Sequence, residues 1–315
     1  LDPRVTSFEQ LYLLRDLGFN RVSLGIQDFD PNVQKAIQRH QPVEMVWRFV
    51  EECRNVGFSS INFDLIYGLP MQTRESMEAT LSLVTQMAPD RVAFYRLALL
   101  PEIFKWQRTF KESEIPEDDA ILDFMLQAMD VFGRSGWQFI GLDHFAQDSD
   151  ELTRAMNNGT LRRSFQGMTT GDTLPVIGVG PSAISSFDDL FVQNEAQFPA
   201  WTRKVESSGC ATVKGHRLSR DDLIRQWAIN QLYCYRRIGK NDFEVIFGVG
   251  FDQYFARSKT AWCELADLGL IEESEHDFRI RPITGWLLMR VIAATFDSYL
   301  TPDSWRVGVQ SKIAS

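Results

Sequence analysis

The segment NFDLIYGLP at 62–70 constrains the fold of this chain more than any other. It is an apolar strand that stops on glycine and proline, and GIQDF at 25–29 ends an earlier strand in a similar way. A helix-like segment separates the two strands. This order predicts a βαβ unit of a parallel sheet, in which functional groups gather at the carboxyl ends of the strands.

The same alternation runs through the first half of the chain. Strands are expected at 21–26, 60–70, 91–101 and 137–142, and helices at 8–17, 31–39, 43–56, 73–87 and 117–132. A complete eight-stranded barrel takes about 250 residues, and only four strands precede a change of pattern. The sequence therefore predicts an α/β fold with an incomplete (β/α) partial barrel over 1–147, which begins on the end of a strand or its loop.

The second half has a different pattern. Residues 148–204 are expected to be rich in loops, and residues 205–315 to form a small helical domain. In that domain we expect helices at 218–237, 241–248, 251–268 and 285–300, and a hairpin at 270–280. Helices followed by a small hairpin resemble a winged-helix module, but its charges are balanced, whereas DNA-binding modules usually present a basic face.

Composition narrows the class of protein. The chain has 315 residues, 44% of them hydrophobic, and a formal net charge of -9. The acidic balance argues against a nucleic-acid partner. No apolar run approaches the ~20 residues of a membrane span, and no signal peptide is visible, so a cytoplasmic protein is expected. Four scattered cysteines show no metal-binding spacing and are interpreted as reduced core thiols.

Three polar residues stand out near strand ends. Asp64 lies inside an apolar strand, and a buried carboxylate needs a partner, so it either pairs with an arginine or binds a ligand. Gln27 follows the first strand, where its amide bonds either to a ligand or to loop backbone. Arg39 is expected near a helix end, where a solvated arginine, or one that bonds to the last carbonyls, is usual.

Other candidates have ordinary structural interpretations. Ala98 and Ile184 would be core residues on sequence alone, and Tyr67 and Phe94 either line a flat cavity or pack in the core. The run GVGPSAIS at 178–185 contains glycines but is weak evidence for a dinucleotide site, because it does not follow the first strand of a Rossmann unit.

Several segments, in order, resemble the oxygen-independent coproporphyrinogen III oxidases, radical S-adenosylmethionine (SAM) enzymes of haem synthesis. They are GFNRVSLGIQDF (18–29), QRHQ (38–41), FDLIYGLP with MQT (63–73), LPEIFKWQR (100–108), GLDHFA (141–146), RSFQGMTT (163–170) and GVGPSAIS (178–185). Together they extend over nearly the whole chain. GLDHFA and FQGMTT resemble the decarboxylating branch more than the related haem-chaperone branch.

The resemblance implies a radical SAM fold in which SAM is bound by Gln27, Arg39, Asp64, Ala98 and Ile184. It implies two SAM molecules, a [4Fe-4S] cluster, and an external electron donor and acceptor. The implied reaction is oxidative decarboxylation of two propionates of coproporphyrinogen III to vinyl groups, giving protoporphyrinogen IX. A radical derived from SAM removes a hydrogen from the propionate β-carbon, and the side chains position the reactants and exclude water.

The chain departs from the family pattern in several places. The cluster signature CxxxCxxC and the GGGTP-type segment are absent from the 315 residues, so a fragment without its amino-terminal cluster-binding part, inactive alone, is expected. Met168 stands where tyrosine is usual, Leu99 where histidine is common, and Pro175 in a loop that normally has no proline. These changes affect the expected substrate pocket.

Arg162 and Arg163 are the candidate substrate-binding residues. A guanidinium can bind a carboxylate through two hydrogen bonds, which suits a tetracarboxylate tetrapyrrole. Because the two residues are adjacent, only one would face a pocket in regular structure, and the alternative for the other is a solvated loop position. A second candidate function is a haem or porphyrin carrier of the non-catalytic branch.

Overall fold

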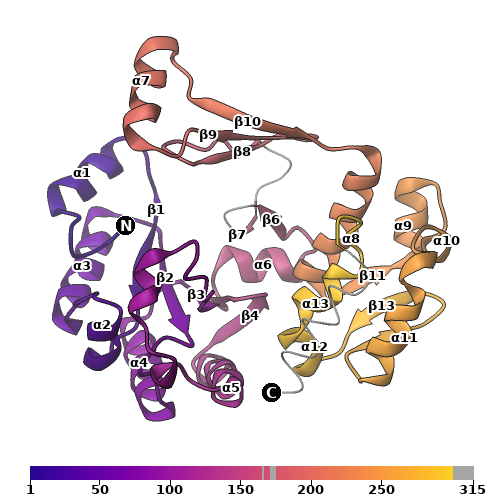
Figure 1. Cartoon of the computed structure of the whole chain (residues 1–315), viewed down its shortest axis with the longest axis horizontal. Helices are drawn as coiled ribbons and strands as arrows, with labels where there is room; N and C mark the ends of the chain where they lie inside the picture. Colours follow the sequence, from indigo (N-terminus) through magenta and orange to yellow (C-terminus); the bar gives the residue numbers. More distant parts are fainter. Residues whose placement is uncertain (165–166, 171–174, 301–315) are drawn as a thin grey trace. The chain divides into compact units, whose positions relative to one another are not determined.

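The computed structural model describes residues 1–164, 167–170 and 175–300. The chain divides after Arg154 into two compact units (Figure 1). The first unit is α/β, and the second combines small antiparallel sheets with helices. Every helix in the described part of the chain is too short or too polar to cross a bilayer.

The first unit contains a five-stranded sheet with the order β1-β2-β3-β5-β4. Its strands are β1 (Arg21–Gln27), β2 (Ser60–Tyr67), β3 (Arg91–Arg96), β4 (Trp137–Gly141) and β5 (His144–Gln147), and its helices are α1 (Phe8–Asp16), α2 (Pro31–Ala36), α3 (Val43–Val56), α4 (Arg74–Met87) and α5 (Asp118–Arg134). The first three strands are parallel, as predicted. Their carboxyl ends therefore meet at one edge of the sheet.

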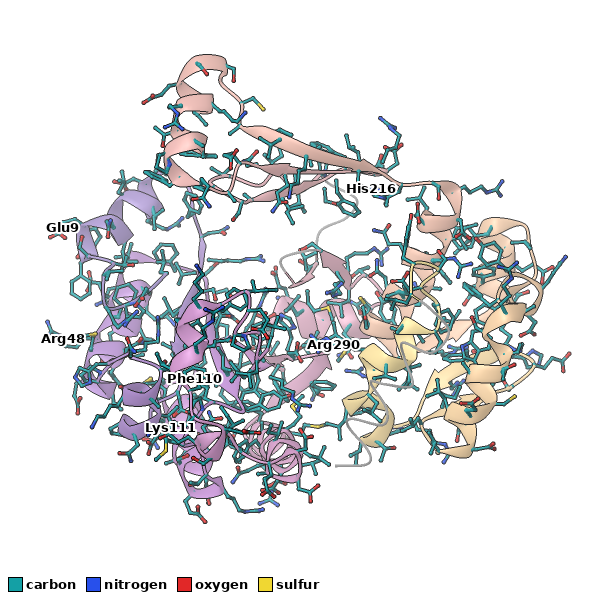
Figure 2. All side chains as sticks on the ribbon, viewed as in Figure 1. Glu9, Arg48, Phe110, Lys111, His216 and Arg290 are labelled. Atoms are coloured by element: carbon teal, nitrogen blue, oxygen red, sulfur yellow. The ribbon has the colours of Figure 1, made fainter. Side chains whose placement is uncertain are left out.

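Helices cover one face of this sheet. Figure 1 shows α1 to α4 along one side of the strands, and Figure 2 shows Glu9 and Arg48 pointing outward from α1 and α3. Alternate strand residues, including Leu24, Phe63 and Val92, are fully buried against this layer. Tyr67 and Phe94 stack in the same core, with ring centroids 4.6 Å apart, so the core interpretation of these two aromatics is confirmed.

The opposite face of the sheet is polar. Its residues alternate with the buried ones, as the two-residue period of a strand requires. They include Ser23 on β1, Asn62 and Asp64 on β2, Tyr95 on β3 and His144 on β5, all half-buried. A polar, partly open face that is not covered by helices is the natural place for a ligand in a partial barrel.

The prediction missed strand β5. Gly141, with φ 151°, and Leu142, with φ 54°, turn the chain back after β4, so that β5 lies antiparallel to both β3 and β4. The expected run of parallel strands therefore ends at β3. Two boundaries were also wrong, because β3 stops at Arg96 rather than near Pro101, and α2 stops at Ala36.

An ion-pair network lies at the amino-terminal end of β3. Arg91 Nε donates to both Asp150 carboxylate oxygens at 3.1 Å, and its Nη2 donates to Glu151 at 2.7 Å. Asp150 is buried and also accepts from the backbone N–H of Leu152 at 2.7 Å. This network ties the segment after β5 to the sheet, at the end opposite the carboxyl edge.

The second unit begins in α6 (Glu151–Asn157) and continues with short strands that the sequence did not predict. They are β6 (Arg162–Ser164), β7 (Gly167–Thr169), β8 (Ile184–Ser186), β9 (Leu190–Asn194) and β10 (Thr212–Arg217), with α7 (Phe198–Ser208) between β9 and β10. These short elements alternate with loops, so residues 148–204 contain more regular structure than expected. Pairing of β10, which carries His216 (Figure 2), with β9 also joins residues on both sides of the expected boundary at 204.

The last part of the second unit has the element order of a winged helix. It contains α8 (Arg220–Tyr235), β11 (Arg237–Gly239), α9 (Lys240–Phe247), α10 (Phe251–Tyr254), α11 (Lys259–Asp267) and the hairpin β12 (Ile271–Glu273) with β13 (Asp277–Ile280). Phe255, Trp262, Phe278 and Phe296 form its aromatic core. The single helices expected at 251–268 and 285–300 are broken, the second into α12 (Thr284–Leu287) and α13 (Met289–Ala294).

The Arg91–Asp150 network gives a prediction for stability. Asp150→Asn removes one acceptor from a buried guanidinium, which should lower the free energy of unfolding by about 1–3 kcal/mol. Chemical denaturation followed by circular dichroism measures this change. Asp148→Asn, which alters an exposed carboxylate two residues earlier, should change stability by less than about 0.5 kcal/mol. Equal effects of the two variants would contradict the role of the network.

Candidate functional site

The candidate site lies at the carboxyl ends of β1 and β2, around Gly25. The strand register sets Gly25 opposite Asp64. A Cβ atom added to Gly25 would lie 3.1 Å from Gln27 Nε2 and 3.2 Å from Arg39 Nη2. The absence of a side chain at 25 therefore lets these two predicted residues converge above the strand, next to the carboxylate.

Gln27 has a strained backbone. Its φ is 70°, and the N–H of Asp28 donates to Ile26 O at 3.0 Å across it. A bond from residue i+2 back to residue i with positive φ between them is the rare form of the γ-turn. A non-glycine residue in such a conformation costs about 1–3 kcal/mol, and such residues concentrate at ligand sites.

The side chain of Gln27 has unused hydrogen-bonding capacity. Its Oε1 atom is buried and accepts no hydrogen bond from the residues that the structure describes. A buried acceptor without a donor costs about 1–3 kcal/mol, so a ligand that donates to it would recover this energy. In the alternative interpretation the Gln27 amide bonds to loop backbone, but Oε1 makes no such bond to the described residues.

Arg39 reaches the site from beyond the end of α2. Its Nη2 donates to Gly25 O, and its Nη1 donates to Asp2 Oδ2 at 3.1 Å. Its Nε is buried and has no acceptor in the described part of the chain. Burial lowers the pKa of Arg39 and the Asp2 carboxylate opposes that shift. The expectation that Arg39 is solvated or bonds to the last carbonyls of a helix was therefore wrong, because its side chain turns back onto β1.

Asp2 is held by two arginines. Arg4 donates to it through Nε and Nη2, and Arg39 adds a third contact. These bonds, above all the one from Arg4, lower the pKa of Asp2 to about 2. The segment 1–4 is also joined to β1, because Gly25 N donates to Leu1 O at 3.0 Å. Asp2 was not predicted, and it orients Arg39.

Asp64 is half-buried and hydrogen-bonded to neutral donors. Its Oδ2 accepts from Ser23 Oγ and its Oδ1 from Asn62 Nδ2, both at 2.8 Å. Burial raises the pKa of Asp64, and these two hydrogen bonds lower it to a smaller extent. The sequence left open a structural pair with an arginine, but no cationic side chain lies within ion-pairing distance of Asp64 in the described residues. A ligand that donates hydrogen bonds or carries positive charge would compensate this carboxylate.

Ala98 lies in the loop after β3 and is exposed, so it is not a core residue. Its carbonyl accepts from Gln107 Nε2 at 2.9 Å, while Gln107 Oε1 accepts from Leu100 N at 2.6 Å. Buried Gln107 therefore holds the backbone of this loop. Gln107 was missed because a glutamine in a loop carries no distinguishing sequence signal.

A cavity of about 950 Å³ lies beside the same loop. Its lining includes Arg96 and Leu99 near the end of β3, and Arg108 and Phe110 near the 3₁₀ turn Lys105–Thr109. Figure 2 shows Phe110 in this part of the unit. Leu99, one of the departures from the family pattern, is 47% exposed and lines the cavity, where the usual histidine would be polar.

Ile184 belongs to the second unit, where it begins β8 and is half-buried. A Cβ atom at Gly178 would lie 2.7 Å from Ile184 O, so only glycine fits there. Asn194 Nδ2 donates to Gly178 O at 3.3 Å and Gly180 O at 3.1 Å, which closes the turn. GVGPSAIS therefore forms a tight turn, and the core interpretation of Ile184 was wrong because this residue is only half-buried.

Arg162 and Arg163 are neighbours on β6, so their side chains point to opposite faces. Arg162 Nη1 donates to Leu161 O at 3.2 Å, while the Arg163 guanidinium lies 5.0 Å from the ring centroid of Tyr233. Arg163 also lines a cavity of about 310 Å³ with Arg225 and Asn230 of α8. The expectation that only one of the pair faces a pocket agrees with this arrangement.

Two of the family departures lie in the second unit. Met168 on β7 is buried and pairs with Arg163 across the hairpin, while Pro175 is exposed. Phe165 and Gln166, which belong to the RSFQGMTT segment, lie outside the described residues. The buried thioether of Met168 packs against the arginine-bearing strand and, unlike the usual tyrosine, adds no hydroxyl there.

Comparison with known proteins agrees with this architecture. The Radical SAM superfamily profile matches residues 2–84. The oxygen-independent coproporphyrinogen III oxidase of Salmonella typhimurium is 40% identical over 300 residues, which is 95% of this chain and 65% of the relative. That of Thermostichus vulcanus is 36% identical over 97% of this chain and 94% of the relative.

A solved structure shows the same similarity. Coproporphyrinogen III oxidase from Escherichia coli, described as a radical SAM enzyme, superimposes with a TM-score of 0.89 at 39% identity, over 95% of this chain and 69% of that one. The chain belongs to the oxygen-independent coproporphyrinogen III oxidase family. It spans about two thirds of the length of several of these oxidases, 65% for that of Salmonella typhimurium.

SAM, the cofactor that the radical SAM oxidases share, fits the residues of the first unit. Gln27 Oε1 and Arg39 Nε are a buried acceptor and a buried donor without partners, and the Asp64 carboxylate lies across from them. SAM offers hydroxyl and amine donors, carboxylate acceptors and a positive charge. This donor and acceptor set matches the three side chains.

The iron–sulfur cluster of the oxidase family does not fit the cysteines present. Cys53 and Cys234 are buried, and burial raises the pKa of each thiol to about 12. Cys210 and Cys263 are exposed, so the expectation of core thiols was wrong for these two. No group of three or more cysteine, histidine or acidic side chains suited to a metal occurs among the described residues.

Besides Asp2 and Gln107, the sequence also did not predict Ser23 and Asn62. Both bond to Asp64, and Asn62 also donates to Ser23 Oγ at 2.8 Å. Each lies two residues from a site position on its own strand, Ser23 before Gly25 and Asn62 before Asp64. The two-residue period of a strand would have identified them.

The strained turn gives a test of the site. Gln27→Gly relieves the positive φ but makes the unfolded chain more flexible, so the free energy of unfolding should change by less than about 1 kcal/mol. Gln138→Gly, the same change at an exposed position of β4 without positive φ, should lower it by about 1 kcal/mol. Denaturant titration of both variants measures the difference, and a large loss in Gln27→Gly alone would contradict the strain.

Proposed function

We propose that this chain forms the SAM-binding and substrate-binding parts of an enzyme that oxidatively decarboxylates coproporphyrinogen III to protoporphyrinogen IX without oxygen. The observation that carries the proposal is the pair of buried atoms without partners, Gln27 Oε1 and Arg39 Nε, beside Asp64. Family membership supports the reaction class. An enzyme, rather than a porphyrin carrier, needs such a cofactor site.

Each residue of the first unit has a distinct part in binding. Asp64 accepts hydrogen bonds from the ribose hydroxyls of SAM or pairs with its ammonium group. Gln27 accepts a donor through Oε1, and Arg39 donates through Nε while its other nitrogens remain bonded to Gly25 and Asp2. The loop at Ala98, held by Gln107, offers backbone and a small apolar surface to the adenosyl part.

SAM, together with the cluster, supplies the radical that removes hydrogen from the substrate propionate. The side chains of this chain hold no acid or base role in that step. They orient SAM on the polar face of the sheet, where strand packing keeps them fixed, and they keep water away from a reactive centre. For Ile184 of the second unit, the proposal that it contacts SAM rests on the family resemblance alone.

The substrate is proposed to bind through carboxylate contacts to Arg163. Arg163 is exposed, but its guanidinium lies over the Tyr233 ring and lines the cavity of about 310 Å³, so this contact favours one orientation before a ligand arrives. Arg162, on the other face of β6, is proposed to contribute charge rather than a direct contact. Two propionates must react, which supports the use of two SAM molecules in each turnover.

The cluster ligands are proposed to come from outside the 315 residues, because the four cysteines are dispersed over four elements or loops and two are buried. An external electron donor and an acceptor are needed for the same reaction, and the cytoplasm is the proposed location.

The role of Asp64 is tested by Asp64→Asn in the cluster-containing enzyme. Loss of a charge-assisted hydrogen bond of about 1.5–3 kcal/mol should weaken SAM binding roughly 10- to 150-fold, as measured by calorimetry. Burial raises the pKa of Asp64, so wild-type affinity should fall with decreasing pH before an ordinary aspartate protonates, and the variant should lose this dependence. Unchanged affinity would refute the assignment.

The substrate contacts are tested by the single variants Arg163→Ala and Arg162→Ala. The first should weaken porphyrinogen binding by about 10-fold or more with little effect on SAM affinity, because it removes a preoriented guanidinium. The second should have the smaller effect. The proposal that arginines of β6 bind the substrate fails if both variants bind the porphyrinogen as tightly as the wild type does. Tight haem binding without turnover would favour the carrier function instead.

The placement of the cysteines predicts the behaviour of the 315-residue chain alone. Incubated anaerobically with iron and sulfide, it should develop no visible cluster absorbance and should not cleave SAM when reduced. Addition of the CxxxCxxC segment of a family member should restore both signals. Reductive cleavage of SAM by the chain alone would show that its own cysteines hold a cluster.

A further inference from the structure

Asp28 is fully buried directly after the strained residue Gln27. Its Oδ1 accepts from Asp30 N at 2.7 Å and from Thr80 Oγ1 at 2.9 Å, and its Oδ2 accepts from Gln72 Nε2 at 2.6 Å. No cationic side chain lies within ion-pairing distance of Asp28 in the described part of the chain. Burying a charged carboxylate at this position costs free energy, and burial accordingly raises the pKa of Asp28.

The donors around Asp28 are themselves fixed. Gln72 Oε1 accepts from Leu69 N and its Nε2 also donates to Ile66 O, both at 2.8 Å, so this amide cannot turn over without losing both bonds. Thr80 Oγ1 accepts from Phe29 N at 3.3 Å. Each oxygen of Asp28 therefore faces at least one N–H group with a fixed direction.

The backbone of Asp28 is held as firmly as its side chain. Gln34 Nε2 donates to Asp28 O at 2.9 Å, and Asp28 N closes the turn across Gln27 by donating to Ile26 O. The network thus joins the end of β1 to the loop after β2 and to α4. All of these bonds hold the residue that follows Gln27, and none involves the side chain of Gln27.

We propose that Asp28 is a positioning residue for SAM binding, which maintains the strained turn at Gln27 and so directs the Gln27 amide toward the ligand. This inference rests on the proposed function, in which Gln27 contacts SAM. A turn with positive φ at glutamine relaxes unless its ends are fixed, and Asp28 fixes one end through its five hydrogen bonds. Its cost of burial is the reason to assign it this task rather than a general stabilising one.

Asparagine cannot replace Asp28. Whichever way the new amide is turned, its NH₂ group would meet either Gln72 Nε2 or Asp30 N, both of which donate. Asp28→Asn should therefore shift the segment after β1 and let the turn at Gln27 relax. The expected result is a loss of SAM affinity of about 3- to 10-fold, similar to that of Gln27→Gly, because both changes remove the same hydrogen bond.

The experiment is a double-mutant cycle on SAM affinity, measured by calorimetry in the cluster-containing enzyme. The variants are Gln27→Gly, Asp28→Asn and the two together. If Asp28 acts through Gln27, the affinity of the double variant for SAM should be at most about 2-fold lower than that of the weaker-binding single variant. Multiplicative losses in the double variant would overturn the positioning role.

Asp150→Asn is the matched control, because it makes the same change at a buried, hydrogen-bonded carboxylate at the opposite end of the sheet. It should lower stability and leave SAM affinity unchanged. If Asp28→Asn does not fold, Thr80→Val removes one of the bonds to Asp28 and should weaken SAM binding by about 2- to 3-fold.

The outcomes separate the two proposals. Normal SAM affinity in Gln27→Gly would refute the SAM site itself. Weakened affinity in Gln27→Gly with normal affinity in Asp28→Asn, or in Thr80→Val if that variant is used, would refute only the positioning role. A loss of affinity in Asp150→Asn as large as that in Asp28→Asn would show a general effect of lost stability and would also refute it.

Discussion

The parallel pairing of β1 with β2 is the constraint on which the candidate site depends. It sets Gly25 opposite Asp64 and brings the carboxyl ends of the two strands to one edge. Because strand residues alternate between faces, the same register buries Leu24 and Phe63 against the helices and leaves Ser23, Asn62 and Asp64 on the polar face. A shift of one residue would exchange the two sets, so the apolar core fixes the position of the carboxylate.

The site stores unfavourable energy that a ligand can release. Asp64 is half-buried among neutral donors, Gln27 and Arg39 each hold a buried polar atom without a partner, and the turn at Gln27 is strained. A protein selected for stability alone would lose such features, since each costs about 1–3 kcal/mol. Their convergence in space around Gly25 is the physical argument for a binding site rather than a structural cluster.

Much of the first unit could be predicted from the sequence. Regular alternation of apolar strands and amphipathic helices located β1, β2 and α3 closely, and the cost of burying a carboxylate in an apolar strand singled out Asp64 as a candidate site residue. The hairpin β4–β5 could not be predicted in this way, because its direction depends on positive φ at Leu142, a residue that gives no turn signal. The strands of residues 162–217 were missed since most are short and lack alternation, as in the six exposed residues of β10.

The positions of Gln27, Arg39, Ala98 and Ile184 came from family resemblance and not from chemistry visible in the sequence. The structure adds physical reasons for two of them, through the atoms without partners at Gln27 and Arg39. It also shows the hydrogen bonds that join Asp2 to Arg39, Gln107 to the backbone at Ala98, and Gln72 to Asp28. Long-range hydrogen bonds of this kind depend on tertiary contacts, which local sequence patterns do not encode.

The most direct test of the central claim is amide hydrogen exchange, measured by mass spectrometry in the cluster-containing enzyme with and without SAM. If SAM lies at the carboxyl ends of β1 and β2, exchange should slow in peptides covering residues 25–29 and 64–68 and remain unchanged in α9 and the β12–β13 hairpin. The account would be contradicted if SAM bound with full affinity while exchange in those two peptides stayed the same.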